Sequence, residues 1–143
     1  MIAFRFDTIV LVILVLLSTA ARSEQAPYTP LSNITSIEVR PGWSGQRHLV
    51  TDRSKLQEVV DETNTLRQKA WGSFVGKPGS CVMRVNFLVN DKRVLSFILS
   101  AKHIIKPALK GQKGKLYLQV NANEIPHLRA LLISIGLPER CAW

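Results

Sequence analysis

Hydrophobic and polar residues alternate with a period of two in several short stretches of the chain, and this pattern predicts β-strands. Between residues 34 and 40, Ile37 and Val39 are flanked by polar positions that include Glu38 and Arg40. The same alternation recurs in three later stretches, residues 82–89, 94–99 and 116–120. Since alternation places polar side chains on one face, we expect an antiparallel sheet with one covered face and one face in water.

The first two of these later stretches are joined by a segment with strong turn chemistry. Asn90, Asp91 and Lys92 lie between them, and short Asn- or Asp-containing connections favour a tight reversal of the chain. The sequence therefore predicts a β-hairpin, with polar residues such as Arg84 and Asn86 on its exposed face.

Two other stretches have apolar residues at spacings of three and four, which is typical of amphipathic helices. The first is expected to begin at Thr51 as N-cap, and its apolar face comprises Leu56, Val59, Val60, Thr63, Leu66 and Ala70. The second is expected to follow Asn123 as N-cap, with Pro126 at the third helical position and Gly136 as the C-terminal cap. Its apolar face comprises Ile125, Leu128, Leu131, Leu132 and Ile135.

These elements predict one α+β domain over residues 34–143: an antiparallel sheet of about four strands with two helices packed on one face. The expected order is strand-helix-strand-strand-strand-helix. Residues 22–33, which contain prolines and serines, are expected to form a spacer, and the glycines and proline of residues 72–80 indicate a loop. The chain has no internal repeat, and we recognise no resemblance to a known family.

The N-terminal residues 1–21 have the pattern of a signal peptide. Arg5 precedes an apolar run from Ile9 to Leu17, and small residues follow as far as Ala21. Cleavage after Ala20 or Ala21 would deliver a periplasmic or secreted protein. The alternative is an uncleaved N-terminal membrane anchor, which is less favoured because a spanning helix needs about 20 apolar residues.

Cys81 and Cys141 are the only cysteines, and in an oxidising compartment they are expected to form one disulfide. According to the chain-entropy model, a disulfide that closes a loop of about 60 residues stabilises the folded protein by about 4 kcal/mol. A zinc site is not indicated, because neither cysteine has a second ligand at metal-binding spacing. A nucleophilic cysteine is the less favoured alternative.

The chain is strongly basic, with a net charge of +9 that persists when the predicted signal peptide is removed. Net charge of this size indicates an anionic partner: an acidic protein, an envelope polymer or a lipid surface, with nucleic acid less favoured. The strongest local bias is in residues 102–115, a predicted mobile connection with no acid and the lysines Lys102, Lys106, Lys110, Lys113 and Lys115. Trp43 and Phe74 lie in glycine-containing segments and are the candidate aromatic anchors. A solvated basic segment without a ligand is the alternative interpretation.

Catalytic and metal motifs are weak in this sequence. His48, His103 and His127 have no second histidine or carboxylate at metal-ligand spacing, and no nucleophile elbow or phosphate-binding glycine loop is present. We therefore expect no metal and no cofactor.

The sequence favours an exported, non-catalytic binding module of the cell envelope or exterior, such as an inhibitor, an immunity-type protein or an accessory ligand-binding domain. The alternatives are a small secreted enzyme that uses His48 or His103 with carboxylates, and a structural component of envelope assembly. Asn33 begins a glycosylation sequon, which matters only in a eukaryotic secretory pathway.

Overall fold

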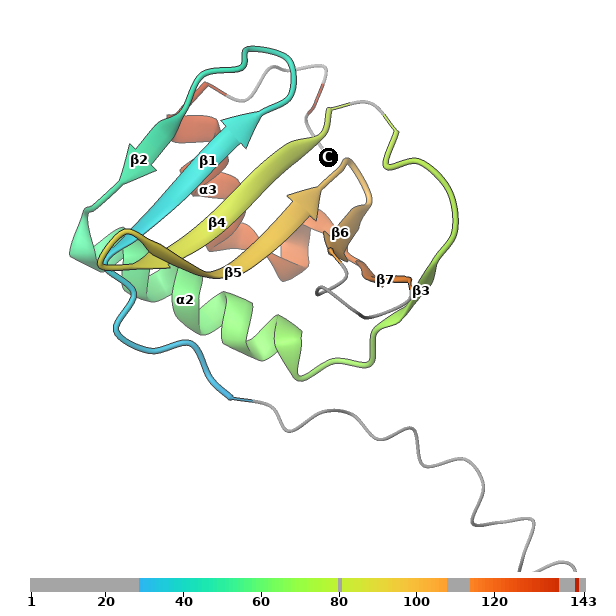
Figure 1. Ribbon diagram of the computed structural model, residues 1–143, viewed down its shortest axis with the longest axis horizontal. Coiled ribbons are helices and arrows are strands. Elements are labelled where there is room, and N and C mark those ends of the chain that lie inside the picture. Colours follow the sequence, from blue (N-terminus) through green and yellow to red (C-terminus); the bar gives the residue numbers. More distant parts are fainter. Residues whose placement is uncertain (1–28, 80, 108–113, 137–140, 142–143) are drawn as a thin grey trace, which may run out of the picture.

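In the part of the chain that the structure describes, a seven-stranded antiparallel sheet and two α-helices form the fold (Figure 1). The computed structural model describes residues 29–79, 81–107, 114–136 and 141. The strands are β1 (Ser36–Pro41), β2 (His48–Val50), β3 (Gly72–Phe74), β4 (Met83–Val89), β5 (Lys92–Leu99), β6 (His103–Lys106) and β7 (Lys115–Gln119). The helices are α2 (Arg53–Arg67), α3 (Pro126–Ser134) and the short 3-10 helix η1 (Ala122–Glu124). The predicted α+β class with an antiparallel sheet is confirmed.

The predicted number of about four strands, and with it the predicted element order, is wrong. The spatial order is β2-β1-β4-β5-β6-β7-β3, and β2, β3 and β6 were not expected. Each of these strands has only three or four residues, which is too short to show a clear alternation. β3 lies in the predicted loop 72–80 and pairs with β7, a partner distant in sequence.

The β4–β5 hairpin is confirmed. Asn90 and Asp91 form its turn with backbone φ angles of 48° and 65°, and Val89 pairs with Lys92 across it. Two successive residues with positive φ make a turn whose twist matches that of the flanking strands. The turn therefore places β4 and β5 side by side near the centre of the sheet.

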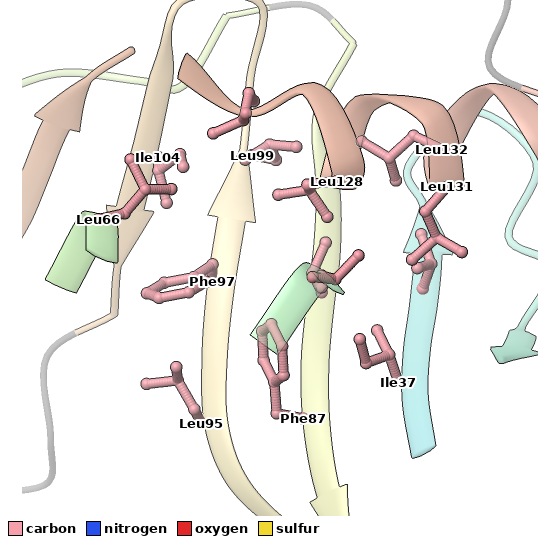
Figure 2. Packing of buried hydrophobic residues seen from close by; sticks show 14 of the residues in the cluster. Ile37, Leu66, Phe87, Leu95, Phe97, Leu99, Ile104, Leu128, Leu131 and Leu132 are labelled. Atoms are coloured by element: carbon pink, nitrogen blue, oxygen red, sulfur yellow. The ribbon is translucent and has the colours of Figure 1, made fainter. Parts of the chain in front are cut away.

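Both helices cover the same face of the sheet, so the core lies in a single layer between the helices and the sheet (Figure 1). Figure 2 shows Leu66 of α2 and leucines of α3 gathered against the apolar side chains of the strands. Phe87 and Phe97 meet edge to face at the centre of this layer, with ring centroids 6.1 Å apart, and Trp71 stacks on Phe97 at 5.8 Å. The face of the sheet opposite the helices has no helix over it in the described part of the chain.

The first helix begins one residue later than predicted. Asp52, rather than Thr51, is the N-cap, and its carboxylate accepts hydrogen bonds from the backbone N–H groups of Ser54 and Lys55 at 3.0 and 3.2 Å. Carboxylate caps satisfy otherwise unpaired donors at the first turn. The buried face is the predicted one as far as Leu66, but Ala70 lies beyond the end of α2.

The last helix also begins differently. Asn121, not Asn123, is a cap, and it forms a capping box with Glu124 at the start of η1. α3 then begins at Pro126, which occupies the first helical position rather than the third. Proline fits there because the N–H that it lacks would have no partner within the helix.

The predicted disulfide is confirmed. Cys81 and Cys141 are bonded, with their Cα atoms 5.5 Å apart. Cys81 immediately precedes the β4 region, so the bond attaches the C-terminal part of the chain to the central strands. No helix in the described residues is long and apolar enough to cross a membrane.

Candidate ligand-binding cleft

The face of the sheet that lacks helices carries polar side chains at its centre. Ile37 and Val39 enter the core, so Glu38 lies on the opposite face of β1. Register then aligns Glu38 with Asn86 of β4, and Asn86 with Ser96 of β5. The next row on this face contains Arg40 and Arg84.

A β-bulge brings Arg93 onto this face as well. Leu95 pairs with Phe87 in the core, and strict alternation from Leu95 would turn the Arg93 side chain toward the core as well. The register shifts between Phe87 and Leu88, so that Arg93 pairs with Leu88 instead. Bulges insert one residue and reverse the facing of the positions beyond it. Arg93 therefore lies beside the β4 residues of the open face.

These side chains surround a cleft of about 370 Å³, which we call the arginine cleft. Its lining residues are Glu38, Arg40, Arg47, Arg84, Asn86, Leu88, Asp91 and Arg93. They come from β1, β4, β5, the hairpin turn and the segment between β1 and β2. The volume lies at the lower end of the range of small-molecule sites, which is about 300–1,000 Å³.

Glu38 lies at the floor of the arginine cleft, with only 6% of its side chain exposed. Arg40 donates through Nε to Oε1 at 2.6 Å and through Nη2 to Oε2 at 3.3 Å, and Arg47 forms an ion pair with Oε2. Asn86 Nδ2 donates to Oε1 at 2.8 Å. Burial raises the pKa of Glu38, but the hydrogen bonds from Arg40 and Asn86 and the charges of both arginines outweigh it and lower the pKa. Glu38 is therefore ionised at neutral pH.

The arginine cleft keeps an excess of positive charge after this pairing. Four guanidinium groups line it against the carboxylates of Glu38 and Asp91. Within the described residues, Arg84 and Arg93 form no ion pair, and both are exposed. Because a guanidinium presents fixed pairs of N–H donors that match carboxylate and phosphate oxygens, these two side chains are suited to hold an anion.

Asn86 adds a neutral acceptor to the same place. It is 5% exposed, and its Oδ1 has no hydrogen-bond partner among the residues that the structure describes. A buried polar atom without a partner costs about 1–3 kcal/mol. The arginine cleft is therefore lined by two cationic side chains without ion-pair partners and by Asn86, whose buried Oδ1 has no hydrogen-bond partner among the described residues.

A cluster of rings lies farther along the same face, over β6, β7 and β3. Phe74, His103 and Tyr117 contact one another, with centroid separations of 5.6 to 5.9 Å. Tyr117 packs over Gly72, where an added Cβ would lie only 3.0 Å from the ring. Glycine allows this close approach between the edge strand and the ring.

The predicted lysine site lies elsewhere and is only partly described. Lys110 and Lys113 fall outside the described residues. Lys102 is exposed before β6, whereas Lys106 ends β6 and Lys115 begins β7. The expectation of a mobile connection throughout residues 102–115 is therefore wrong for these strand positions. Alternation places Lys106 and Lys115 on opposite faces of the sheet, because Ile104 is in the core and Lys115 follows the register of Tyr117.

The other candidate residues have structural neighbours. Trp43 is half-buried against the core cluster, and Phe74 belongs to the ring cluster. Neither lines the arginine cleft. Whether either residue, or the lysine segment, contacts a ligand stays a prediction.

The histidines are not brought together. His48 is in β2 and His103 in β6, with three strands between them, a separation of roughly 19 Å at about 4.8 Å per strand. His127 lies on α3, where its Nδ1 is 3.4 Å from Glu58. No group of three or more metal-ligating side chains occurs in the part of the chain that the structure describes.

Sequence reasoning missed the arginine cleft, although one signal for it was present. Glu38, Arg40, Arg84 and Asn86 occupy the polar positions of two predicted strands, but only the pairing of β1 with β4 makes them neighbours. Arg93 required the bulge. No family model, no curated protein and no solved structure matches the chain.

Proposed function

We propose that this protein is an exported, non-catalytic binding module whose arginine cleft binds an anionic group. The observation that supports this most directly concerns Arg84 and Arg93. They line the same cleft as Glu38 and have no ion-pair partner in the described structure, whereas the Glu38 carboxylate is already paired with Arg40 and Arg47. An anion held by either of them would gain charge-assisted hydrogen bonds without displacing an existing pair.

The chemistry of the lining favours recognition over catalysis. Arginine stays protonated at neutral pH and therefore does not exchange protons with a substrate. Glu38 is engaged by Arg40, Arg47 and Asn86, so its oxygens are occupied. These groups can orient a ligand by charge and shape.

The proposed location is the periplasm or the exterior, where the partner would be an acidic protein, an anionic envelope polymer or a lipid surface. The signal-like pattern of residues 1–21 and the Cys81–Cys141 disulfide support this location. Protein recovered from the periplasm or medium should begin at Ala21 or Arg22. Recovery of full-length chain in the membrane fraction would favour the anchored alternative.

The binding proposal is tested by calorimetric titration of the disulfide-bonded protein with inorganic phosphate and with glucuronate. The variant Arg84→Gln/Arg93→Gln should bind at least about tenfold more weakly, as expected for the loss of hydrogen bonds to a charged group. The matched control is Arg53→Gln/Lys55→Gln, which removes the same charge from exposed positions of α2. Equal losses in both variants, or no binding by the wild type, would reject the arginine cleft as the site.

A further inference from the structure

The amide of Asn86 can have only one orientation. An ionised carboxylate accepts hydrogen bonds and donates none, so Asn86 must turn its NH₂ group toward Glu38. That bond is 2.8 Å long and is formed between two buried side chains. Oδ1 is thereby directed away from Glu38, and its orientation is set by the ion-paired floor of the arginine cleft.

Along β4, Asn86 lies between Arg84 and the residue that pairs with Arg93, and all three side chains line the arginine cleft. Arg84 is two positions before Asn86 in β4, and Leu88, which pairs with Arg93, is two positions after it. Two residues of a strand span roughly 7 Å. A small ligand whose anionic group is held by either arginine is therefore within reach of Asn86.

The group that reaches Oδ1 must be a donor, and the field of the cleft restricts its charge. Four guanidinium groups against two carboxylates disfavour an ammonium there. A neutral hydroxyl or N–H remains.

We infer that the arginine cleft is selective for a hydroxylated acid, a small molecule or terminal group in which a carboxylate or phosphate lies a few bonds from a neutral hydroxyl, as in an acidic sugar. The arginines hold the anion, and Asn86 Oδ1 accepts from the hydroxyl. This inference rests on the proposed anion-binding function, and it assigns to Asn86 the discrimination that the arginines alone would not provide.

The test compares acids that differ in their hydroxyls. Wild-type protein is titrated with glucuronate and cyclohexanecarboxylate, and with glucose 6-phosphate and cyclohexyl phosphate. We expect the hydroxylated member of at least one pair to bind about tenfold more tightly, the size of effect expected for one buried hydrogen bond. Preference within the first pair identifies a carboxylate as the anion, and preference within the second identifies a phosphate.

Asn86→Leu should reduce this preference to about one while retaining binding through Arg84 and Arg93, and circular dichroism checks that the variant is folded. The wild-type comparison decides the inference even where the variant does not fold. Equal binding of hydroxylated and hydroxyl-free acids, with loss of both in Arg84→Gln/Arg93→Gln, would overturn the inference and leave the anion-binding function intact. Failure of every acid to bind would overturn both.

Discussion

Glu62 of α2 caps the start of α3: its carboxylate accepts a hydrogen bond from the backbone N–H of Leu128 at 2.8 Å and one from His127 at 3.0 Å. α3 has no side-chain cap from its own N-cap residue, Ile125. A side chain of α2 thus accepts hydrogen bonds from backbone N–H groups in the first turn of α3. The two helices are joined by hydrogen bonds as well as by packing. Burial raises the pKa of Glu62, and the two backbone N–H groups offset this only in part.

Replacing Glu62 with Ala should destabilise the protein by about 1–2 kcal/mol, because two helix donors lose their acceptor. Urea unfolding at neutral pH measures the change in the free energy of unfolding. Glu58→Ala is the control, since Glu58 is on the same helix and its polar contact among the described residues is an exposed one with His127. A loss no greater than that of the control would show that the cap contributes little.

Acid should remove the stabilisation that Glu38 provides. Its pKa is lowered in the folded protein, so its contribution is present above the ordinary value of 4.5 and is lost as the pH falls through the folded-state pKa. Glu38→Gln should therefore be less stable than wild type by about 1–3 kcal/mol at pH 7. The difference should shrink steadily below pH 4.5.

Unfolding free energies of both proteins between pH 7 and pH 2 check this expectation. Asp52 and Glu124, whose pKa values are also lowered, are present in both proteins and cancel in the difference. A difference that does not change with pH would contradict the role of charge at Glu38.

Reduction of the Cys81–Cys141 bond should lower the free energy of unfolding by about 4 kcal/mol according to the chain-entropy model. Thermal melts with and without reductant measure the effect. Cys81→Ser/Cys141→Ser should melt near the reduced wild type and should not respond to reductant. Two free thiols in the purified protein would instead contradict the bond and favour the alternative of a reactive cysteine.

The lysine segment is tested by replacing Lys106, Lys110 and Lys113 with Gln together. If these lysines attract anionic partners, binding to anionic vesicles should weaken by about 1 kcal/mol per lysine at low ionic strength. The loss should diminish as salt rises, because exposed charges are screened over about 8 Å at physiological ionic strength. Unchanged affinity and unchanged salt dependence for vesicles, wall polymer and protein partners would exclude the segment as a contact surface.

The parts of the fold that follow from local pattern were predictable from the sequence. The face of α2 from Leu56 to Leu66 repeats at helical spacing, and the turn at Asn90 and Asp91 is encoded by residues that tolerate positive φ. Both features depend on neighbours a few positions away. The Cys81–Cys141 bond was predictable for a different reason, because no third thiol competes.

The candidate site was not predictable, because it depends on contacts between distant segments. Glu38 and Asn86 are 48 positions apart and become neighbours only through the pairing of β1 with β4. The face on which Arg93 lies depends on a single register shift. Alternation alone would place Arg93 on the wrong face. Likewise, the acceptor for the first turn of α3 comes from Glu62, which no local capping pattern could indicate.

Both ends of the strand order are short: β2 and β3, the edge strands, have three residues each. A three-residue edge offers few backbone groups to a strand of another molecule, whereas the longest strands, β4 and β5, have neighbours on both sides. Short edges are one of the ways in which natural sheets avoid edge-to-edge aggregation. In a concentrated solution, this arrangement disfavours aggregates that grow by adding strands at the sheet edge. The broad face of the sheet, rather than its edges, is left as the place where another molecule can attach.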